Sequence, residues 1–273
     1  MPQPISISRG FIGLPGVRLA YEISGRGASV IFLHGGLLDR RMWDEQFWFF
    51  ARRYQTVRYD MRGAGLSETT FSTEPYTHHD DLCEFLKALQ IQPVSLVGFS
   101  NYATVLEFAI AHPSLVQKLV VVSPGLRGYE FRDPWVGSRF AAIVQALEQR
   151  DLAGAAEVFL TMWVDGPYRT PDQVDPLVRE RVRELVTHAF PLTKLAPNLK
   201  GLEPPAIGRL SEVRAPTLVV LGDQDALDIH AIGKLIHDQV SGSQLVTIPG
   251  AGHTLVMERP TEFNRLVDQF LRG

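Results

Sequence analysis

The sequence predicts an α/β fold, in which a mostly parallel, eight-stranded sheet is flanked by helices and interrupted by a helical cap insertion. Short β-branched apolar runs alternate with longer amphipathic stretches, which is typical of parallel strands joined by crossover helices. The alternation stops near residue 124 and resumes near residue 212. The 273 residues, 45% hydrophobic and 21% charged, suffice for one large α/β domain with an insertion.

The first half of the chain alternates clearly between predicted strands and helices. Apolar runs that are too short for helices and apolar on both faces predict buried strands. These runs are residues 30–33, 56–59, 94–97 and 119–122, and residues 5–24 predict one or two edge strands. Amphipathic stretches predict helices at residues 42–53, 77–89 and 102–112, the last of which ends before Pro113.

The second half begins with the predicted cap. No convincing strand occurs between residues 124 and 211, and residues 174–190 carry apolar side chains on one helical face. Strands are then predicted at residues 216–221 and 245–248, with helices near 229–240 and after 260. We predict a core of residues 1–123 and 212–273 and a cap of residues 124–211, which should cover the carboxyl ends of the strands.

Composition excludes several classes of function. The net charge of −3 gives no basic surface for nucleic acid, and no apolar run approaches the roughly 18 residues of a membrane span. Residues 1–10 do not resemble a signal peptide, and the single cysteine, Cys83, excludes an internal disulfide. We expect a cytoplasmic monomer or homodimer that binds a small molecule and neither nucleic acid nor membrane.

Ser100 is the candidate nucleophile. The strand predicted at residues 94–97 runs through Gly98 and Phe99 into Ser100 and then into a helix, so Ser100 occupies a sharp strand-to-helix turn. At a helix N-terminus, free backbone N–H groups favour developing negative charge. A serine there is also an ordinary helix N-cap, so this motif alone leaves both interpretations open.

A glycine pair marks a candidate oxyanion hole. The strand at residues 30–33 ends at His34, Gly35 and Gly36, which can turn backbone amides toward a neighbouring site. The amides of Gly36 and Asn101 would form the hole, in which one donor is typically worth about 3–4 kcal/mol of transition-state stabilisation. A simple glycine-rich turn is the structural alternative.

His253 is the candidate base, because a serine hydroxyl needs a base whose pKa lies near working pH. It lies in the loop after the strand at residues 245–248, beyond a carboxyl end of the sheet. The other histidines belong to the glycine turn or to predicted helices, where solvated side chains are usual. They are His34, His78, His79, His112, His188, His230 and His237.

The base requires an orienting carboxylate, and two candidates follow the strand at residues 216–221. Either Asp223 or Asp225 could reach the histidine, and their spacing does not separate them. The strand that ends at Val122 is followed by Ser123 and Pro124 and offers no acid.

Together these motifs resemble the α/β-hydrolase superfamily over nearly the whole chain, with the triad in the order serine, acid, histidine. Residues 60–67 (DMRGAGLS), 222–225 (GDQD) and 250–253 (GAGH) are similar to family signatures. The resemblance implies that the fourth residue of the acid loop, Asp225, is the triad acid. The nearest resemblance is to small serine carboxylesterases and to 3-oxoadipate enol-lactonase-like enzymes with a helical cap.

The chain departs from the family at Tyr102, where the elbow usually carries a glycine or another small residue. We expect Ala103 to take over the close helix–sheet packing and the phenol of Tyr102 to point into the pocket. Cap aromatics are usually core, but some should line the pocket. The candidate pocket residues are Leu37, Tyr102, Trp135, Trp163 and Phe190, and Arg127 or Arg132 could bind a substrate carboxylate.

The predicted reaction is acyl transfer, in which Ser100 attacks a small carboxylic ester or lactone and water releases the acyl-enzyme. No metal and no organic cofactor is implied, and residues 78–80 (HHD) predict a polar surface patch. The alternatives are a carbon–carbon bond hydrolase, a cofactor-free perhydrolase with the same triad, or a catalytically weak ligand-binding relative.

Overall fold

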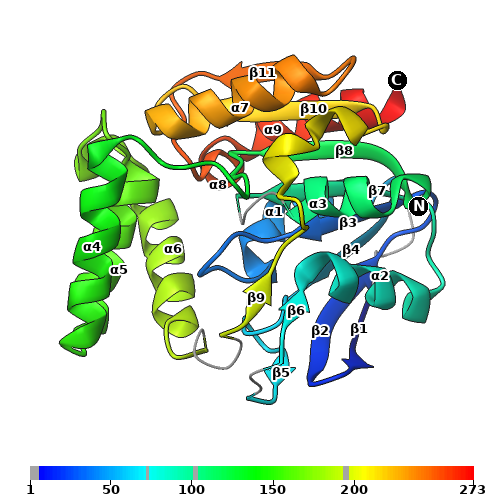
Figure 1. The fold of residues 1–273 in the computed structure, drawn as a ribbon, viewed down its shortest axis with the longest axis horizontal. Coiled ribbons are helices and arrows are strands. Elements are labelled where there is room, and N and C mark those ends of the chain that lie inside the picture. The colour runs from blue at the N-terminus through cyan, green and yellow to red at the C-terminus, as the bar shows by residue number, and fades with distance from the viewer. Residues whose placement is uncertain (1–5, 72–73, 101–103, 193–196) are drawn as a thin grey trace.

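The computed structural model describes residues 6–71, 74–100, 104–192 and 197–273 (Figure 1). A twisted sheet forms the centre of the molecule (Figure 1). Three helices stand together at one side of it, and these are α4 (Pro134–Glu148), α5 (Leu152–Leu160) and α6 (Pro176–Ala189). The predicted α/β fold with a mostly parallel sheet is confirmed. The division at residues 124 and 211 into core and cap stays a prediction.

The main sheet follows the strand order β1-β2-β4-β3-β7-β8-β10-β11. The first two strands are antiparallel to their neighbours, and every pair from β4 to β11 is parallel. The strands are β1 (Ile7–Leu14), β2 (Val17–Ser24), β3 (Ser29–Leu33), β4 (Gln55–Tyr59), β7 (Val94–Phe99), β8 (Val116–Val122), β10 (Thr217–Gly222) and β11 (Gln244–Ile248).

Three two-residue strands were not predicted. The strand β5 (Glu68–Thr69) pairs with β2 as a ninth member of the main sheet. The strands β6 (Tyr76–Thr77) and β9 (Leu199–Lys200) form a separate parallel pair. That pair connects the chain that follows α6 to the segment just before α2.

Helices cover both faces of the sheet, which is why its inner strands are mostly buried on both sides. Consecutive strand residues point to opposite faces. In β4, Arg58 lies over the ring of Phe47 in α1, with 4.4 Å from guanidinium carbon to ring centroid. The next residue, Tyr59, stacks on Phe85 of α2 at 4.5 Å between centroids. Helices α1 and α2 therefore lie on opposite faces.

The predicted helices are confirmed, with shifts at their ends. The segment predicted at 42–53 begins as a 3₁₀ turn (Arg40–Trp43) before α1, and α4, α5 and α8 were not predicted individually. The helices are α1 (Asp44–Phe50), α2 (His78–Leu89), α3 (Thr104–Ala111), α4 (Pro134–Glu148), α5 (Leu152–Leu160), α6 (Pro176–Ala189), α7 (Leu227–Gln239), α8 (Leu255–Glu258) and α9 (Pro260–Arg272).

Each of the helices α4 to α6 begins with an aspartate N-cap. The carboxylates of Asp133, Asp151 and Asp175 accept hydrogen bonds from backbone N–H groups in the first turn of each helix. A proline follows as the first residue of α4 and of α6, where its missing N–H costs nothing. Within the described part of the chain, no helix has both the length and the apolar character needed to cross a membrane.

The predicted surface patch at the start of α2 is wrong for its two histidines. His78 and His79 are buried, because the first turn of α2 packs inward, and only Asp80 is exposed. His79 Nδ1 lies 3.6 Å from the buried Glu107 carboxylate of α3. The pKa of His78 is lowered to about 3, chiefly because burial removes the water that would solvate its charged form.

Burial of neutral His78 predicts an acid-sensitive fold. The unfolded chain takes up a proton near pH 6.5 that the native state binds only near pH 3. Stability is therefore complete above about pH 6.5 and falls with decreasing pH, by up to about 1.4 kcal/mol per pH unit. Urea unfolding between pH 7.5 and 5 should give a shallower pH slope for His78→Gln than for the parent. Equal slopes would contradict this account.

Candidate active site

Ser100 lies immediately after β7 in a left-handed backbone conformation, with φ of +54°. This conformation is uncommon for a residue with a side chain and concentrates at functional sites. The backbone N–H of Ser100 donates to the Val122 carbonyl at 2.9 Å. A Cβ on Gly98 would lie 2.5 Å from a methyl of Val105 in α3, so only glycine fits that approach.

Ser100, His253 and Asp225 form one hydrogen-bonded chain. His253 Nε2 lies 3.1 Å from Ser100 Oγ, and His253 Nδ1 lies 2.9 Å from Asp225 Oδ2. A carboxylate only accepts, so Nδ1–H donates to Asp225, and Nε2 is left to accept the Ser100 proton. Three side chains from three loops thus meet at the carboxyl edge of the sheet.

The two candidate acids occupy different positions. Asp225 is buried and contacts the imidazole through Oδ2, while its Oδ1 accepts from the Ala226 N–H at 2.8 Å. Asp223 instead accepts the Gly250 N–H at 2.7 Å and so connects the acid loop to the histidine loop. Close approach of these loops also requires Gly222, where a Cβ would lie 2.2 Å from the Ala251 carbonyl oxygen.

Two rings and a hydroxyl fix the position of His253. The ring of Trp163, which follows α5, lies 4.3 Å from the imidazole between centroids, and Phe99 meets it edge-on at 5.0 Å. The Ser123 hydroxyl donates to the His253 carbonyl at 2.9 Å. Ser123 directly follows β8, the strand after which the sequence has no acid to orient the histidine. Its hydroxyl holds the histidine backbone.

A buried ion pair holds the residues on either side of the histidine. Glu258 accepts from the Gly252 N–H at 3.1 Å and from the Thr254 hydroxyl at 3.0 Å. Arg169, which precedes α6, donates to the same carboxylate at 2.6 Å and to the Val164 carbonyl at 2.6 Å. The pair therefore connects the histidine loop to the segment between α5 and α6.

Glu258→Ala should lower the free energy of unfolding by about 3–5 kcal/mol, because it leaves the buried Arg169 charge without its carboxylate. Urea unfolding at neutral pH measures this loss. The double variant Arg169→Met with Glu258→Leu should recover much of the stability, because neither buried charge then remains. A loss below 1 kcal/mol in the single variant would contradict the ion-pair assignment.

The loop after β3 is held by a buried neutral histidine. His34 Nδ1 donates to the Gly35 carbonyl at 2.8 Å, and Nε2 accepts the Met61 N–H at 2.9 Å. Burial lowers the pKa of His34, which agrees with this neutral tautomer. Asp60 anchors the same region by accepting from the backbone N–H groups of Arg40 and Leu66. Burial raises the pKa of Asp60.

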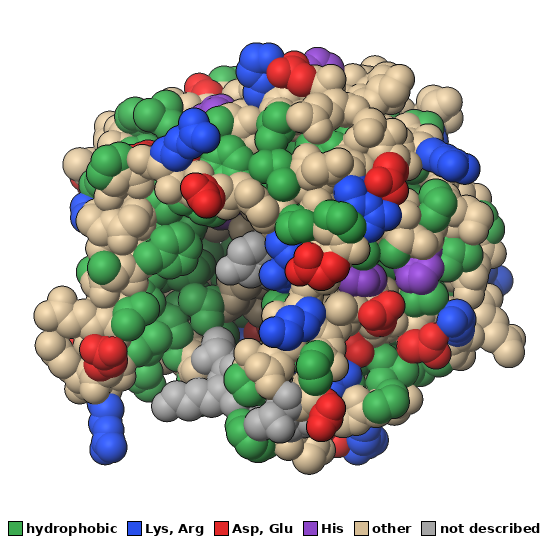
Figure 2. Space-filling view, in the orientation of Figure 1, with side chains coloured by type: hydrophobic (Ala, Val, Ile, Leu, Met, Phe, Trp, Pro, Cys, Tyr) green, Lys and Arg blue, Asp and Glu red, His purple; other side chains and the backbone are tan. Residues whose placement is uncertain are grey.

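A cavity of about 530 Å³ opens above Ser100 and His253. Figure 2 shows the corresponding hollow, lined by hydrophobic side chains, between helices α4–α6 and the rest of the molecule. Gly36, Leu37 and Trp163 line the cavity. Asn101 and Tyr102 lie outside the described residues, so the two-amide oxyanion hole and the position of the phenol stay predictions.

Two predicted wall residues do not line this cavity. Phe190 is buried in the hydrophobic core after α6. Trp135 packs under the guanidinium of Arg139, 3.8 Å from its ring centroid. The sequence analysis missed several apolar residues that do line it, and these are Leu38, Phe99, Leu126, Tyr129, Phe131, Phe140, Phe159 and Ile229.

One of these wall residues, Phe140, could have been predicted from the helical spacing of the sequence. Val136, Phe140 and Ile143 follow helical spacing in α4, and Val136 and Ile143 are buried. Phe140 shares their face, whereas Trp135 lies about 100° away around the helix and meets Arg139. The helical phase therefore favours Phe140 over Trp135 for the cavity wall.

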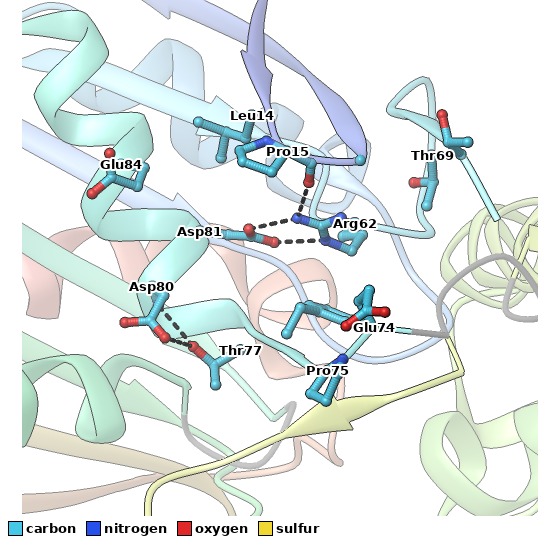
Figure 3. Close-up of a pocket in the computed structure, with 13 residues that line it drawn as sticks. Leu14, Pro15, Arg62, Thr69, Glu74, Pro75, Thr77, Asp80, Asp81 and Glu84 are labelled. Atoms are coloured by element: carbon cyan, nitrogen blue, oxygen red, sulfur yellow. Dashed lines mark hydrogen bonds and ion pairs between the residues drawn. The ribbon is translucent and has the colours of Figure 1, made fainter. Parts of the chain in front are cut away.

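A second cavity, of about 400 Å³, lies between the β1–β2 turn and α2 (Figure 3). Its Arg62 donates to the Asp81 carboxylate at 2.8 and 3.0 Å and to the Pro15 carbonyl (Figure 3). Its described lining residues include no serine, cysteine or histidine, so they do not repeat the serine–histidine pair of the first cavity. The described residues also contain no group of three or more His, Cys, Asp or Glu side chains suited to a metal.

Two curated relatives are similar to almost the whole chain. The putative 2-succinyl-6-hydroxy-2,4-cyclohexadiene-1-carboxylate synthase of Bacillus subtilis is 27% identical over 94% of this chain and 95% of its own length. The serine hydrolase BPHL of Mus musculus is 28% identical over 98% of this chain and 87% of its own length.

Solved structures have the same fold. A bromoperoxidase from Bacillus anthracis superposes with a TM-score of 0.82 at 26% identity, covering 97% of this chain and 100% of that one. An enol-lactonase from Burkholderia xenovorans reaches a TM-score of 0.79 at 22% identity over 97% and 100% of the two chains, a likeness of fold alone.

The model of the alpha/beta hydrolase family matches residues 30–266, which include the elbow, the acid loop and the histidine loop. This match agrees with the sheet order, with the relatives that span the chain and with the resemblance seen in its motifs. The chain therefore belongs to the alpha/beta hydrolase family.

Proposed function

We propose that this chain is a serine hydrolase that cleaves a small carboxylic ester or lactone through an acyl-enzyme. The observation that carries the proposal is the hydrogen-bonded chain from Ser100 through His253 to Asp225 at the floor of an apolar cavity. The similarity to a serine hydrolase over nearly the full length supports it. The chemistry needs no cofactor, because the chain supplies nucleophile, base and orienting acid.

In the proposed reaction, Ser100 Oγ attacks the substrate carbonyl while His253 Nε2 takes its proton. Asp225 keeps Nδ1 protonated and stabilises the imidazolium that forms. The oxyanion would lie against backbone amides, for which Gly36 and Asn101 are the candidates. His253 then protonates the leaving alkoxide, and a water activated by the same imidazole hydrolyses the acyl-enzyme.

Active-site labelling tests this proposal. A fluorophosphonate probe should label the native protein at one site per chain, and peptide mass spectrometry should identify Ser100. Heat denaturation should abolish labelling, because the unfolded serine lacks its base. The same preparation should hydrolyse short p-nitrophenyl esters. A native protein that takes no label and cleaves no ester would refute the proposal.

A cofactor-free perhydrolase is the second candidate, favoured by the similarity to the Bacillus anthracis bromoperoxidase. In that reaction hydrogen peroxide replaces water in releasing the acyl group, and the resulting peracid oxidises halide. Bromination of a phenolic dye in acetate with peroxide and bromide distinguishes the two. Bromination that exceeds ester hydrolysis would favour the perhydrolase.

A further inference from the structure

Four aromatic side chains of this cavity form a continuous series that ends on the imidazole of His253. We call Tyr129, Phe131, Phe140 and Trp163 the aromatic track. Successive ring centroids are 5.9, 6.3 and 6.1 Å apart, with interplanar angles of 87°, 79° and 69°. Trp163 then packs on the His253 imidazole at 4.3 Å. All four line the cavity above Ser100.

The two middle rings of the track are exposed. Phe131 and Phe140 are 38% and 46% exposed, whereas Trp163 is only 8% exposed. Edge-to-face geometry leaves ring faces and edges available to a further apolar or aromatic group. Large apolar side chains exposed next to a cavity are typical of a ligand-binding surface. The track therefore provides apolar binding area that begins beside the base.

The charge at the cavity favours a neutral ligand. Arg127, one of the two arginines predicted to bind a substrate carboxylate, lines the cavity. Its Nε donates to the buried Glu107 carboxylate at 3.0 Å, which compensates its charge. The other arginine, Arg132, is not among the described lining residues. An anionic substrate would have to compete with Glu107 for Arg127.

The position of the base assigns the track to one half of the substrate. His253 must protonate the leaving oxygen, so the group attached to that oxygen lies on the histidine side of Ser100. Trp163, the inner end of the track, packs on that imidazole. We infer that the aromatic track binds the alcohol half of a neutral ester, as an aryl or arylalkyl group. This inference rests on the proposed function and names its substrate class.

Two isomeric esters test which half the track binds. Benzyl acetate carries the ring on its alcohol half, and methyl phenylacetate has the same atoms with the ring on its acyl half. We expect kcat/KM to be at least about tenfold higher for benzyl acetate, equivalent to one well-packed aromatic contact. Equal values, or a preference for methyl phenylacetate, would overturn the inference.

A matched pair of variants tests the track itself. Phe140→Ala should lower kcat/KM for benzyl acetate by about tenfold and for methyl phenylacetate by less than about threefold. Phe11→Ala removes a ring of similar exposure, 42%, in the edge strand β1 and should change neither value. A loss that is equal for both esters in Phe140→Ala would overturn the inference.

An anionic analogue tests the preference for a neutral substrate. Acetate esters of 4-carboxybenzyl alcohol and of benzyl alcohol differ only in the carboxylate, and the anion should react at least about tenfold more slowly, because its charge is desolvated against apolar rings. Faster cleavage of the anion would overturn the neutral assignment.

Fluorophosphonate labelling of Ser100 without cleavage of either isomer would overturn the inference while the serine hydrolase proposal stands. Absence of both labelling and cleavage would refute both.

Discussion

Ser100→Ala is expected to lower kcat for a short p-nitrophenyl ester by at least about 10⁵-fold, the scale seen when a triad nucleophile is removed. In the proposed reaction this hydroxyl is the group that bonds to the substrate carbon, and His253 Nε2 lies 3.1 Å from it. Without Oγ, the base can activate only water, in a position that the site does not define. Initial rates over a range of ester concentrations measure the loss, and KM should change little.

The control for this prediction is Ser138→Ala, which removes an exposed hydroxyl on α4 and should leave kcat unchanged. Removing one hydroxyl should also leave the thermal unfolding midpoint of Ser100→Ala within a few degrees of the parent. Full hydrolysis by Ser100→Ala would exclude it as the nucleophile. Loss of activity together with unfolding would be resolved by Ser100→Cys, which should fold and take up a thiol-reactive probe at residue 100.

The strands and helices that the sequence predicted are those whose burial pattern can be recognised within one continuous segment. A strand such as β7 is covered by helices on both faces, so all six of its residues are buried and most of them are apolar. The pairs β5–β2 and β6–β9 escaped prediction because two residues carry no periodicity. These short strands are defined by backbone hydrogen bonds between segments that are far apart in the chain. The sequence of one segment does not indicate which segment it pairs with.

The meeting of the three loops that carry Ser100, Asp225 and His253 was predictable for a topological reason. The carboxyl ends of parallel strands gather at one edge, so the loops after β7, β10 and β11 had to approach one another. The choice between Asp223 and Asp225 did not follow from spacing and came from the family resemblance. In the structure the two acids point to different partners, Gly250 and His253, and both contacts depend on how two loops fold together.

The surroundings of the site were predicted less well, because helical phase and helix docking decide them. Trp135 was predicted as a wall residue because it is an aromatic residue of the cap, yet its neighbour Val136 belongs to the buried face of α4. His78 and His79 were predicted on the surface because they are polar, but both are buried, and His79 faces Glu107 of α3. Composition predicts average exposure, whereas the orientation of a helix end depends on contacts across the chain.

Asp225→Asn is expected to lower kcat by about 10⁴-fold while the protein stays folded. An asparagine amide can replace the carboxylate in size and still accept the Ala226 N–H, a contact that Oδ1 now makes at 2.8 Å. It cannot stabilise the imidazolium, and it permits the tautomer in which Nε2 carries the proton and Ser100 Oγ has no acceptor. Steady-state kinetics with the same ester measures the effect.

The neighbouring Asp223→Asn is the matched control, because it makes the same chemical change in the same loop. Its side-chain oxygen can still accept the Gly250 N–H, so kcat should stay within about threefold of the parent. Comparing these two variants, whose substitutions lie two residues apart, therefore tests which aspartate orients His253. A loss of about 10⁴-fold in Asp223→Asn with near-normal activity in Asp225→Asn would reverse the assignment. Similar small losses in both would mean that the imidazole functions without a carboxylate.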